Sequence, residues 1–285
     1  MRITKQLIKD FAKLCNISYC KQEQVTEGFI NKPHNKNDSV YYRCSNEPKL
    51  YSCERDSQMY VCNYENSLAV IFRGTESGRD ILTDLNAIRV DMDIPYLKDD
   101  ELPQIHWGFY NQFKELKNNL DDIVELYVKD KQNIEESTPN IIFSGHSLGG
   151  GLATIASVYY GLKYPDTFIN CITFGSPRVG DQKFANLFNS IVTNTYRFVN
   201  DNDPIPCIPT AWRFRHVEGC IWLYQDQVMN EITAWRGWRF FKNYFLSFVG
   251  YGYDASQDHN CEGYVRDLDY IPEGYFNDNH SYYNK

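Results

Sequence analysis

Residues 140–160 constrain the fold of this chain more than any other stretch. Residues 140–144 (NIIFS) are a short apolar run, residues 145–149 (GHSLG) place a serine between two glycines, and residues 148–160 are mostly small and apolar. This order predicts a buried strand, a tight turn and a buried helix. Glycines beside Ser147 suit such a turn because a side chain at either position would collide with neighbouring backbone. We therefore expect Ser147 to stand exposed at the positive end of the helix.

Strands and helices alternate along much of the remaining chain. Apolar runs predict further strands at residues 60–64, 68–72, 168–174, 195–199 and 220–224. Apolar residues that recur at intervals of three and four between positions 109 and 128 predict a long amphipathic helix. The alternation favours an α/β fold, with a mostly parallel central sheet and helices on both faces.

The length and composition predict a single domain over residues 1–285. A chain of 285 residues with 42% hydrophobic content is ample for one large core. Within this domain we expect an N-terminal packing helix in residues 1–20 and an aromatic insert at about 225–255. No run of about 18 apolar residues occurs, so no transmembrane helix is predicted.

Charge and cysteine content bear on the partners and on the compartment. The formal net charge of −8 would repel nucleic acid, and no block of lysine and arginine offsets it. The nine cysteines are an odd number without paired CxxC units, and the first residues lack the apolar core of a signal peptide. These features predict reduced thiols, no metal site, no nucleic-acid partner and a cytoplasmic location.

Two motifs carry a resemblance to a known family. Residues 142–153 (IFSGHSLGGGLA) look like the nucleophile elbow of the class 3 (fungal-type) lipases. Residues 174–180 (FGSPRVG) are similar to the strand-end motif that follows the elbow in that family. The resemblance runs from about residue 60 to residue 265. It implies the α/β-hydrolase fold and a serine ester hydrolase, a lipase or esterase of lipid metabolism, that acts on acylglycerols or related esters without metal or organic cofactor.

Hydrolases of this fold place an acid and then a histidine after the nucleophilic serine in the chain. Residues 197–206 (RFVNDNDPIP) directly follow a predicted strand, where a catalytic loop should begin. The family has an aspartate shortly before a proline-containing turn, and Asp203 is the matching position. Asp201 is the local competitor, whose other interpretation is a turn-capping residue. Ser147 and Asp203 are the predicted nucleophile and acid.

Two histidines are candidates for the base. Residues 258–265 (DHNCEGYV) resemble the H-x-x-E-x-Y pattern around the catalytic histidine of plant-type class 3 lipases, which favours His259. His280, in the sequence DNHSYY, instead looks like the ending of the fungal members and lies close to the terminus, where chains often fray. We expect His259 to lie within hydrogen-bonding distance of both Ser147 and Asp203.

The predicted oxyanion hole combines two backbone N–H groups. Residues 72–76 (FRGTE) resemble the R-G-[ST] turn of the family, so Thr75 should supply one donor and Leu148 the other. The resemblance also implies a short helical lid over residues 77–85. In this lid Ile81 stands where relatives often have an aromatic residue, which leaves interfacial activation open.

Residues 235–253 crowd nine aromatic side chains together with basic ones. Such a stretch can lie at a membrane or lipid-droplet surface, or it can pack on the core, and both interpretations stay open. The expected partner is a lipid ester substrate, and the first interpretation adds peripheral contact with a lipid surface. The predicted serine, aspartate and histidine also fit a lipid transacylase or a phospholipase A-type enzyme. An alternative of another class is an inactive hydrolase fold that binds lipid, and the complete set of serine, aspartate and histidine argues against it.

Overall fold

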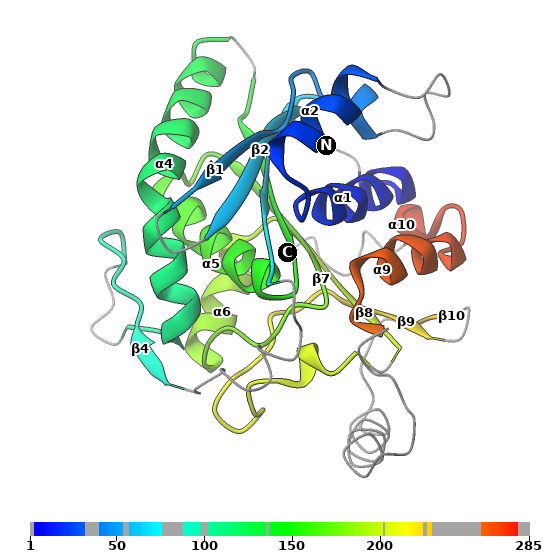
Figure 1. The fold of residues 1–285 in the computed structure, drawn as a ribbon. Coiled ribbons are helices and arrows are strands. Elements are labelled where there is room, and N and C mark those ends of the chain that lie inside the picture. The colour runs from blue at the N-terminus through cyan, green and yellow to red at the C-terminus, as the bar shows by residue number, and fades with distance from the viewer. Residues whose placement is uncertain are drawn as a thin grey trace.

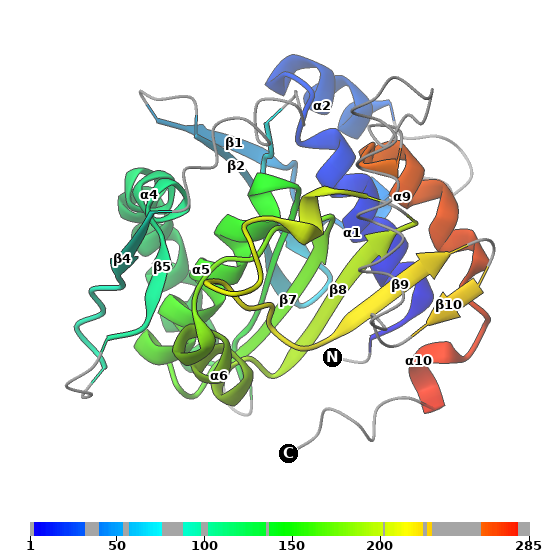
Figure 2. The same cartoon turned by 90° about the horizontal axis from the view of Figure 1, so that it is seen from below.

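A central sheet of eight strands organises the protein (Figures 1 and 2). The computed structural model describes residues 3–31, 40–53, 57–75, 88–97, 102–134, 137–201, 203–224, 227–229 and 258–278. The strands of the sheet, in spatial order, are β1 (Lys49–Ser52), β2 (Gln58–Tyr64), β3 (Ser67–Phe72), β6 (Asn140–His146), β7 (Phe168–Phe174), β8 (Asn194–Asn200), β9 (Cys220–Tyr224) and β10 (Gln227–Met229).

The middle of the sheet is parallel and its margins are antiparallel. Strands β3, β6, β7, β8 and β9 run in one direction, whereas β1 and β2 at one margin and β10 at the other complete it with antiparallel pairs. Parallel neighbours need crossover connections, and α-helices provide those that join β3 to β6, β6 to β7 and β7 to β8. Because the carboxyl ends of the parallel strands meet at one edge, the loops after β3, β6, β7 and β8 share one side of the molecule.

Helices cover both faces of the sheet (Figures 1 and 2). One face carries α4 (Trp107–Gln132), α5 (Leu148–Lys163) and α6 (Gln182–Ile191). The other carries α1 (Lys5–Ile17), α2 (Gln22–Ile30), α9 (Cys261–Asp267) and α10 (Tyr275–Asp278). Short elements complete the described chain: η1 (Val40–Tyr42), β4 (Arg89–Asp91), β5 (Gln104–His106), η2 (Ile205–Cys207) and η3 (Leu268–Tyr270).

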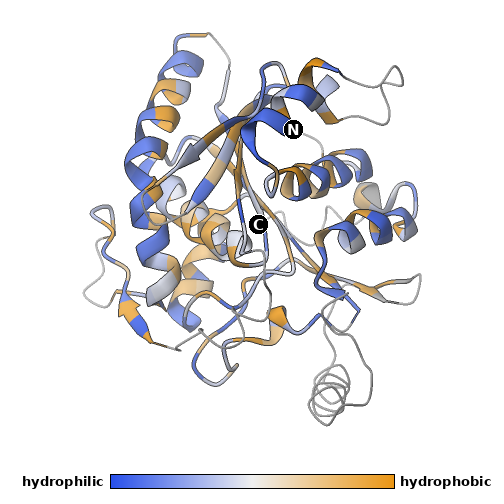
Figure 3. Ribbon diagram, in the orientation of Figure 1, coloured by the Kyte–Doolittle hydropathy of each residue, from blue (hydrophilic) through white to orange (hydrophobic). Residues whose placement is uncertain are grey.

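Alternation along the strands divides the hydrophobic core in two. In β3, Val70 and Phe72 pack in the core under α4, α5 and α6, whereas Ala69 and Ile71 pack under α1 and α9. The other central strands repeat this pattern, because successive side chains of a strand point to opposite faces. Both faces of β3 and β6 are buried, which explains why these strands read as continuous apolar runs. Figure 3 shows α4 as a mixture of hydrophilic and hydrophobic residues.

A buried ion pair fastens α1 to the sheet. Asp10 is fully buried in the middle of this helix. Its carboxylate accepts hydrogen bonds from the Arg43 guanidinium, with Nη2 at 2.6 Å, and from the Tyr64 hydroxyl at 2.6 Å. A buried carboxylate is costly unless it is paired in this way. The pairing therefore fixes α1, and with it the residues that follow its end, against strand β2.

The structure confirms the α/β fold with a mostly parallel sheet and helices on both faces. Each predicted strand and the long helix match an observed element, with ends that differ by a few residues. The lid at 77–85, most of the aromatic insert at 225–255, and His280 lie outside the described residues. Within the described ranges, no helix combines the length and apolarity needed to cross a membrane.

Candidate active site

Ser147 occupies a strained turn between β6 and α5. Its backbone has φ 59° and ψ −131°, a left-handed conformation that a side chain makes costly. The backbone is held there by its own N–H, which donates to the Phe174 carbonyl at 2.9 Å, and by its carbonyl, which accepts from Gly150 at 3.0 Å. The strain places the hydroxyl at the N-terminal end of α5, as in a nucleophile elbow.

Close backbone approaches require the glycines on both sides of Ser147. A Cβ atom at Gly145 would lie 2.3 Å from the Gly149 carbonyl carbon, and one at Gly149 would lie 2.2 Å from the Phe72 carbonyl oxygen. Both distances are far inside van der Waals contact, and both neighbours are backbone atoms that cannot rotate away. Side chains at these positions would collide as expected, because the start of α5 lies against Gly145 and the end of β3 lies against Gly149.

Three side chains form a hydrogen-bonded chain at this elbow. The Ser147 hydroxyl lies 2.8 Å from His259 Nε2, and His259 Nδ1 lies 2.9 Å from both carboxylate oxygens of Asp203. Because a carboxylate only accepts, Nδ1 carries the proton and Nε2 is free to accept from the serine. Ser147 and Asp203 are fully buried and His259 nearly so. The expectation of an exposed serine was wrong, since His259 packs directly onto its hydroxyl.

Asp203 has two further donors that fix its orientation. The Tyr264 hydroxyl donates to Oδ2 at 2.5 Å and itself accepts from the Asn200 N–H at 2.9 Å, while the Ile205 N–H donates to Oδ1 at 2.9 Å. The competitor Asp201 lies in the preceding turn, where its carbonyl accepts from the Trp222 indole. Among the two aspartates, it is Asp203 whose carboxylate meets the imidazole of His259.

The motif at residues 174–180 packs against the acid, the base and the loop that follows Asp203. Gly175 has φ +59°, and a Cβ atom there would lie 2.6 Å from Asp203 Oδ2 and 3.1 Å from the His259 ring. Arg178 holds the loop after Asp203, because its backbone N–H donates to Ile208 at 2.8 Å and its guanidinium to Pro209 at 2.7 Å. The glycine makes room for the acid and the base, and the arginine secures the loop that carries the acid.

The remaining described histidines serve other contacts. His106 caps α4 by accepting from the Phe109 N–H at 3.4 Å, and His216 Nε2 lies 2.6 Å from the Pro206 carbonyl. His146 lies beside His259 with its ring centroid 4.6 Å away. His259 is therefore the described histidine that joins a serine to an aspartate, whereas His280 lies outside the described residues.

The turn after β3 packs against the elbow. A Cβ atom at Gly74 would lie 2.6 Å from the His146 carbonyl and 3.2 Å from Ser147 Cβ, so this glycine lets the two backbones meet. Thr75, the predicted first donor of the oxyanion hole, follows immediately and is exposed. Leu148, the predicted second donor, is the first residue of α5, where N–H groups lack partners within the helix. Thr75 thus directly follows a glycine that packs against the elbow, and Leu148 directly follows Ser147 in the chain.

Two contributors to the site were not assigned from the sequence. In the sequence, Tyr264 is the last residue of the H-x-x-E-x-Y pattern and Gly175 is part of the motif at residues 174–180, but neither residue was given a role. The pattern contained the signal for Tyr264, because it lies five residues after His259 and one further turn of α9 brings its hydroxyl to Asp203. Gly175 could not be assigned, because the need for a missing side chain arises only from neighbours that are distant in sequence.

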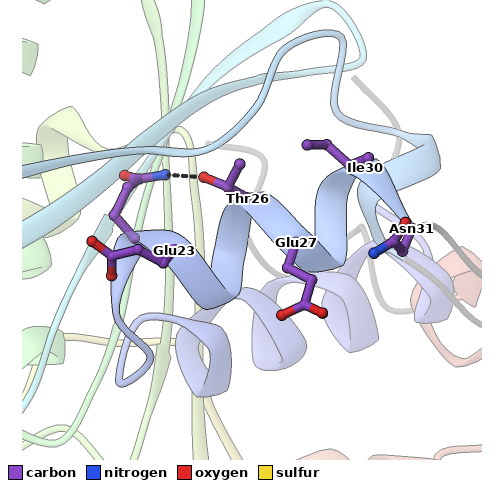
Figure 4. A pocket seen from close by; sticks show the side chains of 6 residues that line it. Glu23, Thr26, Glu27, Ile30 and Asn31 are labelled. Atoms are coloured by element: carbon purple, nitrogen blue, oxygen red, sulfur yellow. Dashed lines mark hydrogen bonds between the residues drawn. The ribbon is translucent and has the colours of Figure 1, made fainter.

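A shallow hollow on the surface of α2 is separate from this site (Figure 4). It is lined by Gln22, Glu23, Thr26, Glu27, Ile30 and Asn31, and none of the three hydrogen-bonded residues contributes to it. In the part of the chain that the structure describes, no three His, Cys, Asp or Glu side chains are grouped so that they could hold a metal ion.

Comparison with known proteins agrees with this geometry. The family model "Lipase (class 3)" matches residues 69–212. A secreted mono- and diacylglycerol lipase of Fusarium solani is 30% identical over 47% of this chain and 40% of its own length. A second protein of that description, from Malassezia globosa, is 32% identical over 57% and 54%, respectively. A Rhizomucor miehei lipase is 30% identical over 56% and 42%. The chain thus spans about half the length of these relatives.

Solved structures share the architecture. A triacylglycerol lipase described as having a serine protease triad at its catalytic centre superposes with a TM-score of 0.63 at 24% identity, covering 77% of this chain and 80% of its own. A Rhizopus microsporus lipase superposes with a TM-score of 0.62 at 22% identity, covering 81% and 80%. These similarities establish the fold, which is that of the α/β-hydrolases.

The relatives correct the predicted location. The proteins from Fusarium solani and Malassezia globosa are named secreted lipases, which points to an extracellular rather than a cytoplasmic location. The cytoplasmic prediction was wrong because it rested on an odd number of cysteines and on charged residues near position 1. Neither feature determines a compartment, since a secreted protein can carry free thiols, and all nine cysteines are free here.

The matched region contains the parts of the site that are contiguous in sequence. It begins in β3, includes the turn after β3 and the elbow, and ends after the loop that carries Asp203. His259 and Tyr264 lie after the matched region in the sequence, and both contact Asp203 in the folded protein. Because the family model matches half of the sequence, this chain belongs to the class 3 lipase family.

Proposed function

We propose that this chain hydrolyses acylglycerols or related lipid esters, with Ser147, His259 and Asp203 as its catalytic triad. The single observation that carries the proposal is the hydrogen-bonded chain from Ser147 Oγ through both ring nitrogens of His259 to Asp203. A serine, a neutral imidazole and a buried carboxylate in this order are the arrangement that activates a hydroxyl for acyl transfer.

In the first half of the reaction, Ser147 Oγ attacks the carbonyl carbon of the ester. Nε2 of His259 takes the hydroxyl proton, and Asp203 stabilises the resulting imidazolium through Nδ1. The tetrahedral oxyanion accepts hydrogen bonds from the N–H groups of Thr75 and Leu148, each of which typically lowers the barrier by about 3 kcal/mol. The bond to the alcohol then breaks, and His259 returns its proton to the leaving oxygen.

In the second half, water replaces the alcohol. Its oxygen attacks the acyl carbon while Nε2 of His259 accepts one of its protons. Collapse of the second tetrahedral intermediate breaks the bond to Ser147 Oγ, which regains the proton from His259. The products are a fatty acid and the free enzyme, so neither an oxidant nor a metal is needed to balance the reaction.

The names of the relatives favour partial glycerides as the first substrates to test. The proteins from Fusarium solani and Malassezia globosa are both called mono- and diacylglycerol lipases. The test is hydrolysis of mono-, di- and triacylglycerols of graded chain length by the purified chain. Ser157→Ala is a matched control, because Ser157 is a buried serine of α5 whose hydroxyl donates to the Ala153 carbonyl within the helix. Hydrolysis that survives in Ser157→Ala and disappears in Ser147→Ala supports the proposal.

Three results would redirect or contradict the proposal. Release of fatty acid from phospholipid but not from acylglycerols would indicate a phospholipase A-type enzyme. Transfer of the acyl group to an added alcohol in preference to water would indicate a transacylase. Lipid binding without turnover of any ester would contradict the proposal and indicate an inactive hydrolase fold.

Contact with a lipid surface is a separate part of the proposal. It rests on the aromatic and basic composition of residues 235–253, because aromatic rings contribute large apolar areas and basic side chains attract anionic head groups. Sedimentation with vesicles should be lost in Trp235→Ala/Trp238→Ala/Phe241→Ala while hydrolysis of a short soluble ester is kept. Loss of both, with a lower melting temperature, would indicate that the stretch is part of the core.

A further inference from the structure

The histidine inside the elbow is bonded to the backbone of the proposed base. His146 Nε2 lies 2.8 Å from the carbonyl oxygen of His259. Because a carbonyl only accepts, Nε2 carries the proton and donates it. The other ring nitrogen, Nδ1, must then accept, and the Tyr19 hydroxyl lies 2.8 Å from it. A directed chain of hydrogen bonds therefore runs from Tyr19 through His146 to the main chain of His259.

Ring packing supports the same connection. The imidazoles of His146 and His259 are tilted by 31° with centroids 4.6 Å apart. The rings of Tyr264 and His146 meet edge to face, with centroids 5.8 Å apart. His146 is buried, and this burial, together with the neighbouring His259, lowers its pKa well below the usual 6.5. His146 is thus a neutral ring at physiological pH, which suits a group that supports a base without competing for its proton.

Tyr19 is fixed where α1 leads into the site. The carbonyl of the next residue, Cys20, accepts from the Tyr60 hydroxyl at 2.8 Å, which fastens this segment to β2. The Tyr19 hydroxyl also lies against the turn after β3, since a Cβ atom at Gly74 would lie 2.4 Å from the hydroxyl oxygen. The Arg73 guanidinium stands over the Tyr19 ring, 5.8 Å from its centroid. The Tyr19 side chain therefore contacts both the turn after β3 and His146.

We propose that Tyr19 and His146 are positioning residues that hold the backbone of His259, and with it the imidazole, in place between Ser147 and Asp203. His259 lies in a turn before α9, and its backbone carbonyl accepts the hydrogen bond from His146. The link from α1 adds a restraint from the opposite end of the chain. This inference rests on the proposed function, because it concerns the geometry of the same triad.

The test compares variants that keep or remove the donor of His146. His146→Gln keeps an N–H near the position of Nε2, whereas His146→Leu keeps bulk but donates nothing. A misplacement of about 1 Å can cost about 100-fold in rate. We expect His146→Leu to lower kcat for p-nitrophenyl butyrate roughly 10- to 100-fold with KM nearly unchanged, and His146→Gln to recover most of that loss. Tyr19→Phe should lower kcat by a smaller factor.

Tyr60→Phe is the matched control for Tyr19→Phe. It removes one hydroxyl bond at the same end of α1 but none at His146. It should therefore lower the melting temperature without lowering kcat. The inference is overturned if Tyr19→Phe and Tyr60→Phe lower kcat equally, if neither Tyr19→Phe nor His146→Leu lowers it, or if His146→Gln is as impaired as His146→Leu. An inactive wild-type chain would instead contradict the proposed function, so the two failures are distinguishable.

Discussion

The two ends of the parallel sheet each carry a buried chain of polar side chains, but the chains differ in kind. At the carboxyl end, the hydroxyl of Ser147 is linked to two ionisable groups, His259 and Asp203. At the amino end, amides form a ladder: Asn194 donates to Asn170 at 2.7 Å, and Asn170 donates to Asn140 at 2.6 Å. The ladder ends on Ser67, whose hydroxyl oxygen accepts from Asn140 at 2.6 Å.

This contrast shows how one sheet separates chemistry from stability. The ladder joins β3, β6, β7 and β8 with neutral groups, each satisfied by a neighbour on the next strand. The carboxyl end instead holds a serine at φ 59° and glycines without which backbones would collide. Strain and ionisable groups gather at the end where we propose that the reaction takes place, whereas the opposite end carries neutral hydrogen bonds that stabilise the fold.

Ser147→Ala should produce the largest effect, and it should be confined to activity. Removing the hydroxyl removes the nucleophile, so ester turnover should fall by about 10,000-fold or more, because a triad acts as a unit. The backbone of the elbow is unchanged by this substitution, so the melting temperature should stay close to that of the wild type. Initial rates and thermal unfolding of both proteins provide the check. Activity above about a tenth of wild type would remove Ser147 from the mechanism.

Asp203→Asn should be nearly as severe. The amide keeps the shape but favours the wrong tautomer of His259, which in comparable triads costs roughly 10,000-fold in kcat. Asp201→Asn is the matched control, since the bonds of His259 go to Asp203. The kcat values for a soluble ester decide between the two positions. Equal losses in both variants would mean that the loop as a whole, and not one carboxylate, matters.

Asn170→Ala should have the opposite profile, with a loss of stability and no loss of chemistry. It breaks the ladder in the middle and leaves Asn140 and Asn194 each without one partner, so we expect the free energy of unfolding to fall by about 2–3 kcal/mol. Activity per folded molecule should be retained. Urea unfolding and active-site titration measure the two quantities. A variant of normal stability but low kcat would show that the two ends are coupled.

The pH dependence of stability should also distinguish the two ends. The pKa of His146 in the folded protein lies well below 6.5. As the pH falls below 6.5, His146 therefore becomes protonated in the unfolded chain while it stays neutral in the folded one. Stability is therefore lost as pH falls below about 6.5, by at most about 1.4 kcal/mol per pH unit. Urea unfolding at pH 7.5 and 5.0 should show a smaller loss in His146→Gln than in wild type. Asn170→Ala should keep the wild-type difference, because amides do not titrate.

The smallest expected effect concerns the strain itself. In the inactive background, Ser147→Gly should be more stable than Ser147→Ala by about 1 kcal/mol, because glycine adopts φ 59° without a steric penalty. Denaturant midpoints of the two variants give the comparison. Equal midpoints would mean that the elbow stores no strain, and the contrast with the unstrained ladder would then fail.

Local features were predictable from the sequence and long-range ones were not. Ser147 stood out because its strand, glycines and helix are contiguous, and the strands were evident from their apolar runs. The end of a predicted strand indicated the loop that carries the acid, but the choice of Asp203 within that loop and the choice of His259 both needed a family resemblance. The hydrogen bond from Tyr19 to His146 joins residues that are 127 positions apart in the sequence. The asparagine ladder depends on which strands are neighbours and on the register of their pairing. Burial of Ser147 was missed for the same reason.

The triad is tested most directly by the position at which a fluorophosphonate probe attaches. The probe reacts with a serine that a neighbouring base has activated, so peptide mapping by mass spectrometry should find one adduct, on Ser147. Labelling should be lost in His259→Ala and kept in His280→Ala. An adduct on another serine, or labelling of Ser147 that survives His259→Ala and is lost in His280→Ala, would contradict the triad described here.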